Sequence, residues 1–342
     1  MYNMPLISRP AHLPPDLCAG LMLTTSETKS GGKKSEWCFA SYSVQPVHSE
    51  GFGACALKDY KKGERILSEK PLATWIVADR SKMQQQDAVT KLLAIINSLD
   101  HVKRAAYFSL CQLPDGDVAG LPGSQESAFA IWMTNAYPTT HASDGRGEGD
   151  GQAVFEQISR LNHACVQCNA ILAWNAKLGA MTCHAARPIR KGESLTVCYW
   201  FDDGWRGMQR AERHERLLER FGFECACATC RLVGPALKKS EERQSRIREL
   251  SGRLSLQSGA GGTARVSSEQ VGEAVAELLQ TLEDEGAPSA WGKRAMLAAR
   301  LAAAKAGEME LARTWGERAM ECVRVSAGAD SPEYETALKH LR

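Results

Sequence analysis

The chain has 342 residues, of which 44% are hydrophobic and 24% are charged, and its formal net charge is +2. This length predicts roughly two domains with a substantial buried core, and the near-neutral charge argues against direct binding to nucleic acid. No apolar stretch reaches the ~18 residues that span a membrane, so we expect no membrane contact.

The N-terminal residues 1–36 predict an irregular tail, because they are rich in Pro, Ser, Thr and Gly. Prolines interrupt residues 1–23, which lack the continuous apolar core of a signal peptide. We therefore expect an intracellular protein, in the nucleus, the cytoplasm or both. In such a protein the 12 cysteines are thiols or metal ligands rather than disulfides.

Short β-strands follow the tail. The stretches 37–47, 53–57 and 65–67 have the texture of strands, and turns separate them at Ser49–Gly51 and Lys61–Glu64. This alternation of strand and turn is typical of a small β-rich fold.

A helical period then interrupts the strands, and it predicts a helical insertion over about 79–150. Within 81–113, Ser81 is a candidate N-cap, and a set of apolar residues shares one helix face. These residues are Val89, Leu92, Leu93 and Ile96. A second short helix is expected over 101–110. The glycine-rich stretch 143–152 predicts a loop, because glycine at alternate positions disfavours regular structure.

Strands return after the insertion. We expect them over 170–174, 180–185 and 195–199, followed by a charged helix over 209–220 that ends near Gly222.

The last part of the chain, 264–342, predicts an all-helical domain behind a glycine-rich hinge at 259–262. Ser267 and Gln270 form a capping box sequence. One apolar stripe follows it, made of Val271, Val275, Leu278 and Leu282. Further helices are expected over 291–306 and 309–325, and Pro332 opens another. These paired helices loosely resemble tetratricopeptide hairpins.

Three cysteines lie within six residues at Cys225, Cys227 and Cys230. Such tight spacing suits a tetrahedral Zn²⁺, with a fourth ligand from elsewhere in the chain. The plainer alternative is a set of thiols without a metal.

Three further motifs occur upstream, at Gly51–Gly53, Asn162–Cys165 and Gly192–Tyr199. In this order, and with the cysteines, they resemble SET-domain methyltransferases of the fungal and SET-and-MYND types that carry a zinc-binding post-SET segment. A MYND finger is not expected, because residues 79–150 hold only Cys111, His101 and His141 as metal-binding side chains of its kind.

The resemblance implies an α+β fold. It predicts a pseudoknotted, β-rich SET core over 37–232, in which the Asn162-His163 segment lies beside the final strand. The helical insertion interrupts this core, the post-SET segment closes it over about 221–232, and the tetratricopeptide-like helical domain follows.

The resemblance also implies a site for S-adenosylmethionine. The residues expected around this cofactor are Phe52, Gly53, Asn135, Asn162, His163 and Phe223. Tyr199 is the expected catalytic residue, and Phe221 is expected to line the substrate channel. Methyl transfer needs a neutral, aligned lysine amine, which a hydroxyl at the end of an apolar channel can orient. The plainer alternatives are turns and packed core side chains.

The resemblance implies Cys165 as the fourth zinc ligand, with Cys168 as the alternative. Gln167, Cys168 and Phe221 depart from the family pattern. The main hypothesis is a protein-lysine methyltransferase whose substrate is a protein, with a histone as one candidate. Because of the departures, a catalytically weak SET scaffold that binds a protein partner through its helical C-terminus is a second hypothesis.

Overall fold

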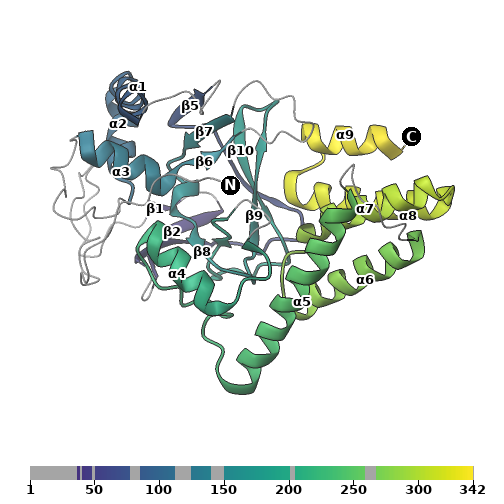
Figure 1. The fold of residues 1–342 in the computed structure, drawn as a ribbon. Coiled ribbons are helices and arrows are strands. Elements are labelled where there is room, and N and C mark those ends of the chain that lie inside the picture. The colour runs from purple at the N-terminus through teal and green to yellow at the C-terminus, as the bar shows by residue number, and fades with distance from the viewer. Residues whose placement is uncertain are drawn as a thin grey trace. The chain divides into compact units, whose positions relative to one another are not determined.

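The computed structural model of the protein describes residues 37–38, 41–47, 51–77, 85–111, 125–139, 150–200, 205–258 and 267–341. The chain divides into two compact units (Figure 1). The insertion unit contains the described residues of 71–137 and 148–159, and the main unit contains those of 36–70, 138–147 and 160–342.

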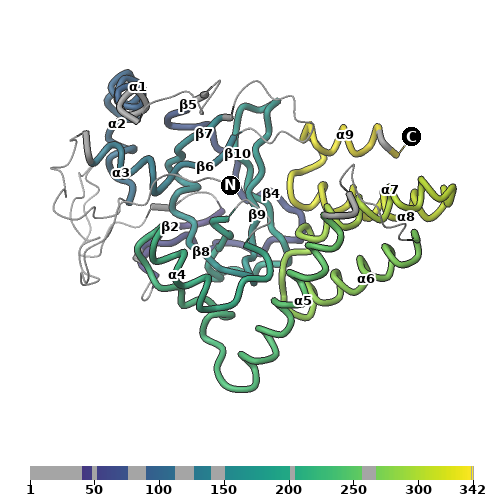
Figure 2. Tube along the Cα trace, viewed as in Figure 1, coloured from purple at the N-terminus to yellow at the C-terminus, as the bar shows by residue number. Residues whose placement is uncertain are grey.

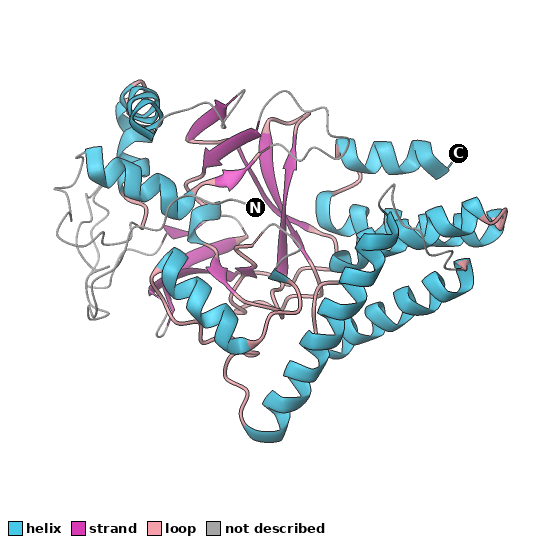
Figure 3. Cartoon of the chain, viewed as in Figure 1, coloured by secondary structure: helices cyan, strands magenta, loops and turns pink. Residues whose placement is uncertain are grey.

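Small sheets form the β part of the main unit, as the magenta arrows of Figure 3 show. One is antiparallel and has the order β1 (Trp37–Cys38), β2 (Tyr42–Val47), β3 (Gly51–Ala56). Another has the order β4 (Arg65–Glu69), β10 (Ala180–Ala185), β9 (Ala170–Asn175). Every residue of β10 is buried, and this central strand pairs along its two edges with β4 and β9. The predicted strands over 65–67, 170–174 and 180–185 are confirmed.

A short parallel pair joins β8 (Asn162–His163) to β11 (Thr196–Val197), and a 3-10 turn, η3 (Ile158–Arg160), precedes β8 in the chain. Thr196 faces Asn162 in this register, and Val197 faces His163. The sequence predicted that the Asn-His segment lies beside the final strand, and this pairing confirms it.

Helices make up the rest of the main unit. They are α4 (Arg210–Phe221), α5 (Gly234–Ser258), α6 (Ser268–Asp284), η5 (Ser289–Gly292), α7 (Lys293–Lys305), α8 (Met309–Ala327) and α9 (Pro332–Leu341). The trace in Figure 2 shows α6, α7 and α8 side by side, in accord with the contacts between them. The predicted Ser267–Gln270 capping box is present, and Val271, Val275, Leu278 and Leu282 are buried. The helical character expected of 264–342 is therefore confirmed for the described residues 267–341.

Helix α5 was not predicted. Most of its residues are charged or polar, and its buried residues form a narrow stripe of Ser240, Gln244, Ile247, Leu250 and Leu254. The apolar residues of this stripe join the core of the helical region together with Val275 and Leu278 of α6. Tertiary packing rather than a broad amphipathic pattern therefore holds α5 in place.

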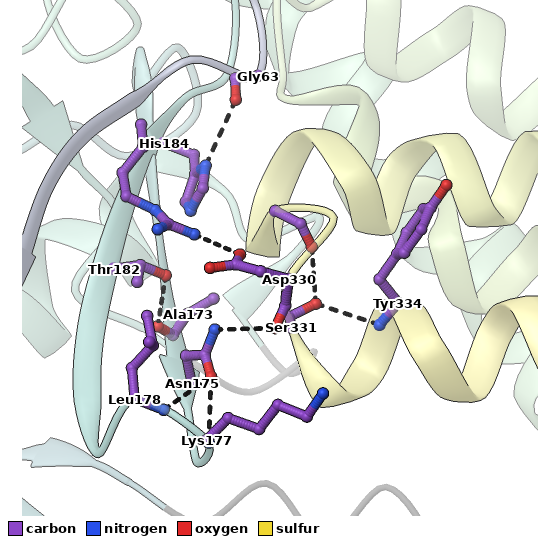
Figure 4. Close-up of polar contacts among 12 residues, drawn as sticks. Gly63, Ala173, Asn175, Lys177, Leu178, Thr182, His184, Asp330, Ser331 and Tyr334 are labelled. Atoms are coloured by element: carbon purple, nitrogen blue, oxygen red, sulfur yellow. Dashed lines mark hydrogen bonds and ion pairs between the residues drawn. The ribbon is translucent and has the colours of Figure 1, made fainter.

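The polar loop between α8 and α9 lies against the sheet of the main unit (Figure 4). The Asp330 carboxylate binds the Arg65 guanidinium at 2.5 Å, and the Asp330 carbonyl oxygen accepts from Asn175 Nδ2 at 3.4 Å. Another ion pair joins Lys177, in the turn between β9 and β10, to Glu335 of α9. These contacts fasten the last two helices to β4 and to the turn between β9 and β10.

The insertion unit has its own sheet and core. Its strands are ordered β5 (Ala73–Val77), β7 (Asp150–Val154), β6 (Tyr137–Pro138), and its helices are α1 (Gln85–Asn97), α2 (His101–Phe108) and α3 (Gln125–Asn135). The core gathers Ala73, Leu92, Ile96, Tyr107, Leu110, Ala128, Ile131, Trp132 and Val154. The two predicted helices of the insertion are confirmed as α1 and α2.

Two expectations for the insertion need correction. Residues 150–152 were expected in a loop, but they pair with β5 as part of β7, because main-chain pairing does not require side chains. Asn135, for which a turn was the plainer alternative, is instead the last residue of helix α3. The tail 1–36, Ser81, the loop 143–149 and the hinge 259–262 lie outside the described residues. In the described part of the chain, no helix is both long and apolar enough to cross a bilayer.

Candidate active site and metal centre

Tyr199 lies two residues after the end of β11, and hydrogen bonds hold both its main-chain nitrogen and its hydroxyl. Its main-chain N–H donates to His163 Nδ1 at 3.1 Å, and its hydroxyl donates to the Leu161 carbonyl oxygen at 2.8 Å. Leu161 directly precedes β8 and His163 belongs to it, and β8 pairs in parallel with β11. The half-buried Tyr199 ring is thereby held against the Asn162-His163 segment.

The His163 side chain has a defined protonation state. Nδ1 accepts from the main-chain N–H of Tyr199, so this nitrogen carries no proton. Burial lowers the pKa of His163 to about 4, which keeps the ring neutral. The single ring proton therefore sits on Nε2, which lies 3.3 Å from Cys165 Sγ and donates to it.

Gly53 and Asn162 are in close contact. A Cβ atom at Gly53 would lie 2.5 Å from Asn162 Nδ2 and 2.9 Å from Val47 Cγ2. Only glycine allows the β3 main chain to approach the Asn-His segment this closely. The neighbouring Phe52 is 37% exposed. The structure thus brings the predicted residues Gly53 and Asn162 together within the main unit.

Asn169, which the sequence did not single out, locks the strand that leads to Tyr199. It is 2% exposed. Its Oδ1 accepts from the Thr196 N–H at 2.8 Å, and its Nδ2 donates to the Ser194 carbonyl oxygen at 2.8 Å. A buried amide that satisfies the main chain on both sides of Leu195 fixes the start of β11.

An aromatic wall lies beside Tyr199. The centres of the Phe221 and Phe223 rings are 5.1 and 6.4 Å from the centre of the Tyr199 ring. Gly222, which separates them, adopts a left-handed conformation with φ of 72° and ends α4. This reversal at the helix end lets residues on either side of one glycine face the same tyrosine. Phe221, predicted to line the substrate channel, and Phe223, predicted to contact the cofactor, thus both lie beside Tyr199, and their roles stay predictions.

Two tryptophans extend the wall, and the sequence did not single them out. The Trp200 and Trp205 rings stack with centres 4.9 Å apart. Trp205 Nε1 donates to the Cys165 carbonyl oxygen at 3.2 Å. Trp200 Nε1 is buried and has no partner among the described residues. The stack therefore connects the neighbourhood of Tyr199 to the main chain of Cys165.

The cysteine cluster converges as predicted from the spacing. The Sγ atoms of Cys165, Cys225, Cys227 and Cys230 all lie within 4.8 Å of one another. Cys165 Sγ and Cys230 Sγ are 3.5 Å apart. Cys168, the alternative ligand, is buried but does not belong to this group.

The thiols of the cluster differ in the direction of their pKa shifts. Hydrogen bonds from Cys165, and then from Cys225 and Cys230, hold the pKa of Cys227 far below its ordinary value. Hydrogen bonds with the neighbouring thiols, Cys225 first, raise the pKa of Cys165 instead, and burial acts in the same direction. Four adjacent thiolates therefore require a compensating positive charge.

Arg213 supplies one buried positive charge at the cluster. Its side chain is 2% exposed, and Nη2 lies 3.9 Å from Cys230 Sγ, while Nη1 donates to the Met208 carbonyl oxygen at 2.5 Å. Burial alone would lower the pKa of Arg213, but Cys165 and Cys230 raise it above its ordinary value. Arg213 belongs to α4, the helix that ends at the aromatic wall.

Asn135, predicted as a cofactor contact, is the last residue of α3 in the insertion unit. Its side chain is buried, and Nδ2 donates to the carbonyl oxygens of Cys111 and Ile131 at 2.7 and 2.8 Å. The amide therefore ties the end of α3 to the main chain at Cys111, beyond the end of α2. Its predicted role stays a prediction.

Residues 51–200 match the family model described as SET domain. Among curated proteins, the chain is 26% identical over 198 residues to "Histone-lysine N-methyltransferase set5" of Schizosaccharomyces pombe, covering 58% of this chain and 53% of that protein. It is 31% identical over 194 residues to "Histone-lysine N-methyltransferase SMYD3" of Mus musculus, covering 56% of this chain and 41% of that protein. The chain therefore spans about half the length of these relatives.

One solved structure, described as "Crystal structure of the SET domain of LSMT bound to Lysine and AdoHcy", is 13% identical with a TM-score of 0.32. The match covers 83% of this chain and 88% of the other.

Proposed function

We propose that the chain is an S-adenosylmethionine-dependent protein-lysine N-methyltransferase, because residues 51–200 match the family model described as SET domain. The observation that carries the proposal is the parallel pairing of β8 with β11. This pairing sets Tyr199 beside Asn162 and His163, and Gly53 lies under Asn162. The names of the two relatives, both histone-lysine methyltransferases, support the same reaction.

We infer that the residues of this chain fit the cofactor, because glycine at position 53 brings the β3 main chain against the Asn-His segment. A Cβ there would lie 2.5 Å from Asn162 Nδ2. Asn162, His163 and Phe223 would hold the cofactor, which supplies the methyl group when bound. We also propose that Asn135 and Phe52 contact the cofactor.

Tyr199 and the aromatic wall would orient the amine of the substrate. The Tyr199 hydroxyl is fixed 2.8 Å from the Leu161 carbonyl oxygen, so its direction is set before a substrate arrives. The half-buried rings of Phe221 and Phe223 exclude water from the same side. An apolar wall disfavours the charged form of lysine and so favours the neutral amine that reacts.

We also propose that the cysteine cluster binds one structural Zn²⁺. Tetrahedral coordination with Zn–S distances of about 2.3 Å places sulfur atoms ~3.8 Å apart. The Cys165–Cys230 separation of 3.5 Å and the 4.8 Å limit for the whole group fit this geometry. Such a zinc would tie the segment 225–230 to the Asn-His segment through Cys165.

We propose a protein substrate, with a histone as one candidate because of the names of the relatives. The helical region after α4 is proposed to hold a protein partner. We also propose that the chain consists of a SET core over 37–232 and a helical domain over 264–342.

The proposal is tested by titrating zinc-loaded protein with S-adenosylhomocysteine, the reaction product, and by following transfer of labelled methyl groups to protein. We expect one-site binding in the micromolar range. Tyr199→Phe keeps the ring and should bind the product within about 3-fold of wild type, while methyl transfer falls roughly 100-fold.

Binding without any methyl transfer in either protein would favour the second hypothesis, a SET scaffold. No binding by folded protein that holds one zinc per chain would overturn the cofactor site itself.

A further inference from the structure

We propose that the His163 side chain is a positioning residue that couples the cysteine cluster to the main chain at Tyr199. The inference rests on the proposed function for its catalytic consequence. Its structural part concerns only one ring and its two partners.

The ring bridges two groups through its two nitrogens. Nε2–H donates to Cys165 Sγ at 3.3 Å, and Nδ1 accepts from the Tyr199 main-chain N–H at 3.1 Å. Each bond requires the other, because a proton on Nδ1 would remove the acceptor that Tyr199 uses. A Cys165 sulfur that accepts from Nε2–H therefore selects the tautomer whose Nδ1 holds Tyr199.

The surroundings leave the ring little room. Its centre is 5.0 Å from that of Tyr199, 5.9 Å from Trp205 and 6.2 Å from Phe223. Trp205 also donates to the Cys165 carbonyl oxygen at 3.2 Å, so the main chain of the cysteine is held from a second side. A displacement of Cys165 Sγ is therefore passed to the ring.

A bound zinc strengthens this bridge. Metal binding fixes Cys165 as a thiolate at a defined position, and thiolate sulfur is a stronger acceptor than a thiol. Groups that donate to metal ligands orient those ligands, and their loss typically weakens metal binding about 10- to 100-fold. We infer that zinc occupancy and the position of Tyr199 depend on each other through His163.

Two substitutions separate the two bonds. His163→Asn places an amide oxygen near the position of Nδ1 but does not reach Cys165. His163→Gln places an amide N–H near the position of Nε2 but offers no acceptor at Nδ1. Each variant therefore keeps one of the two hydrogen bonds of His163 and loses the other, so each is the matched control of the other.

Zinc affinity is measured by competition with a chromophoric chelator, which needs no activity. The zinc Kd should rise about 10-fold in His163→Asn and change less than about 3-fold in His163→Gln. Amide hydrogen exchange at Tyr199 should be about 10-fold faster in His163→Gln than in His163→Asn. In an active enzyme, kcat should fall further in His163→Gln than in His163→Asn, with a smaller change in KM for the cofactor.

The wild-type chain supplies a test without variants. Removing zinc with the chelator should speed amide exchange at Tyr199 about 10-fold. Equal losses of zinc affinity in both variants, or unchanged exchange at Tyr199 after zinc release, would overturn the coupling. If wild-type protein transfers no methyl group, the proposed function fails, but the affinity and exchange measurements still decide the role of His163.

Discussion

The Asn162 side chain lies directly over Gly53, so that a Cβ atom at Gly53 would be 2.5 Å from Asn162 Nδ2. This contact joins the β3 strand to the segment that holds Tyr199. Two residues that were predicted separately as cofactor contacts thus form one surface, and the packing permits only glycine at one of them.

Gly53→Ala should therefore damage the proposed cofactor site. The added methyl group meets Asn162 and Val47, so the Asn-His segment has to shift. We expect the affinity for S-adenosylhomocysteine to fall at least about 10-fold and stability to fall by about 1–3 kcal/mol. Calorimetric titration and chemical denaturation measure the two effects.

Gly252→Ala is the matched control for this change. Gly252 lies on the exposed side of α5, and a Cβ there meets nothing within 4 Å. Alanine should stabilise this helix by about 1 kcal/mol and leave product binding unchanged. Equal behaviour of the two alanine variants would contradict the proposed contact.

Arg213→Met should weaken zinc binding. The substitution removes a buried positive charge 3.9 Å from Cys230 Sγ, and the thiolates lose their nearby counter-charge. We expect the zinc Kd to rise about 10- to 100-fold, and Arg213→Lys to restore part of the loss. Competition with a chelator measures both.

Arg216→Met is the control on the same helix. Arg216 is largely exposed and pairs with Glu212 at 3.8 Å, so its loss should cost less than about 1 kcal/mol. It should leave zinc affinity within about 2-fold of wild type. A similar effect of both arginine variants would show that α4 stability, rather than charge at the cluster, controls zinc binding.

Glu285→Ala should loosen the junction between α5 and α6. The carboxylate is 2% exposed; it binds Arg243 at 2.5 Å and Gln244 at 3.1 Å, and it also accepts from Ser240. Because Arg243 is 30% exposed, the expected cost is about 2 kcal/mol rather than the larger value for a fully buried pair. Denaturant titration measures it.

Glu277→Ala on α6 is the comparison for that experiment. Glu277 pairs with Arg246 at 2.6 Å, but both side chains are well exposed. Its removal should cost less than about 1 kcal/mol. If Glu285→Ala were equally mild, the buried network would not be what fastens α5 to α6.

Motifs predicted much of the site, because their chemistry is local in the sequence. The spacing of Cys225, Cys227 and Cys230 predicted a metal cluster, and their Sγ atoms do converge with that of Cys165. Asn169 and Arg213 could not be predicted in the same way. An asparagine and an arginine are unremarkable in a sequence, and they gain importance only from the strand and the thiolates that tertiary folding places beside them.

In the fold, too, elements with local sequence signals were predictable, and elements that depend on distant partners were not. β9 and β10 were predictable because turn residues bound two short strand-like runs, and α4 because Gly222 marks its end. β5 and β7 were missed because their partners are far apart in the sequence. The long helix α5 was missed because its buried stripe is narrow and is buried only by tertiary packing against α6 and α7.

Acid should weaken the junction in Figure 4 through His184. This side chain is 1% exposed, Nδ1 lies 3.4 Å from the Gly63 carbonyl oxygen, and Nε2 is buried without a partner among the described residues. Burial first, and then Arg65, lower the pKa of His184 below its ordinary value of 6.5. The Asp330 carboxylate has the opposite effect on His184, and Arg65 lowers the pKa of Asp330 below 3.8.

Both shifts have the same sign for stability. A group whose pKa is lower in the folded protein binds fewer protons there than in the unfolded chain, so stability is present above the unfolded pKa and is lost as pH falls. The His184 contribution should be lost from about pH 6.5 downward, and that of Asp330 only from about pH 3.8 downward.

His184→Asn isolates the histidine contribution. Asparagine can keep a donor near the Gly63 carbonyl oxygen but does not titrate. Denaturation at pH 7.5 and 5.5, with zinc present throughout, should show a smaller loss of stability in the variant than in wild type. Acid release of zinc affects both proteins alike, so the difference between them reports His184. Equal losses in the two proteins would show that protonation of His184 does not weaken this junction.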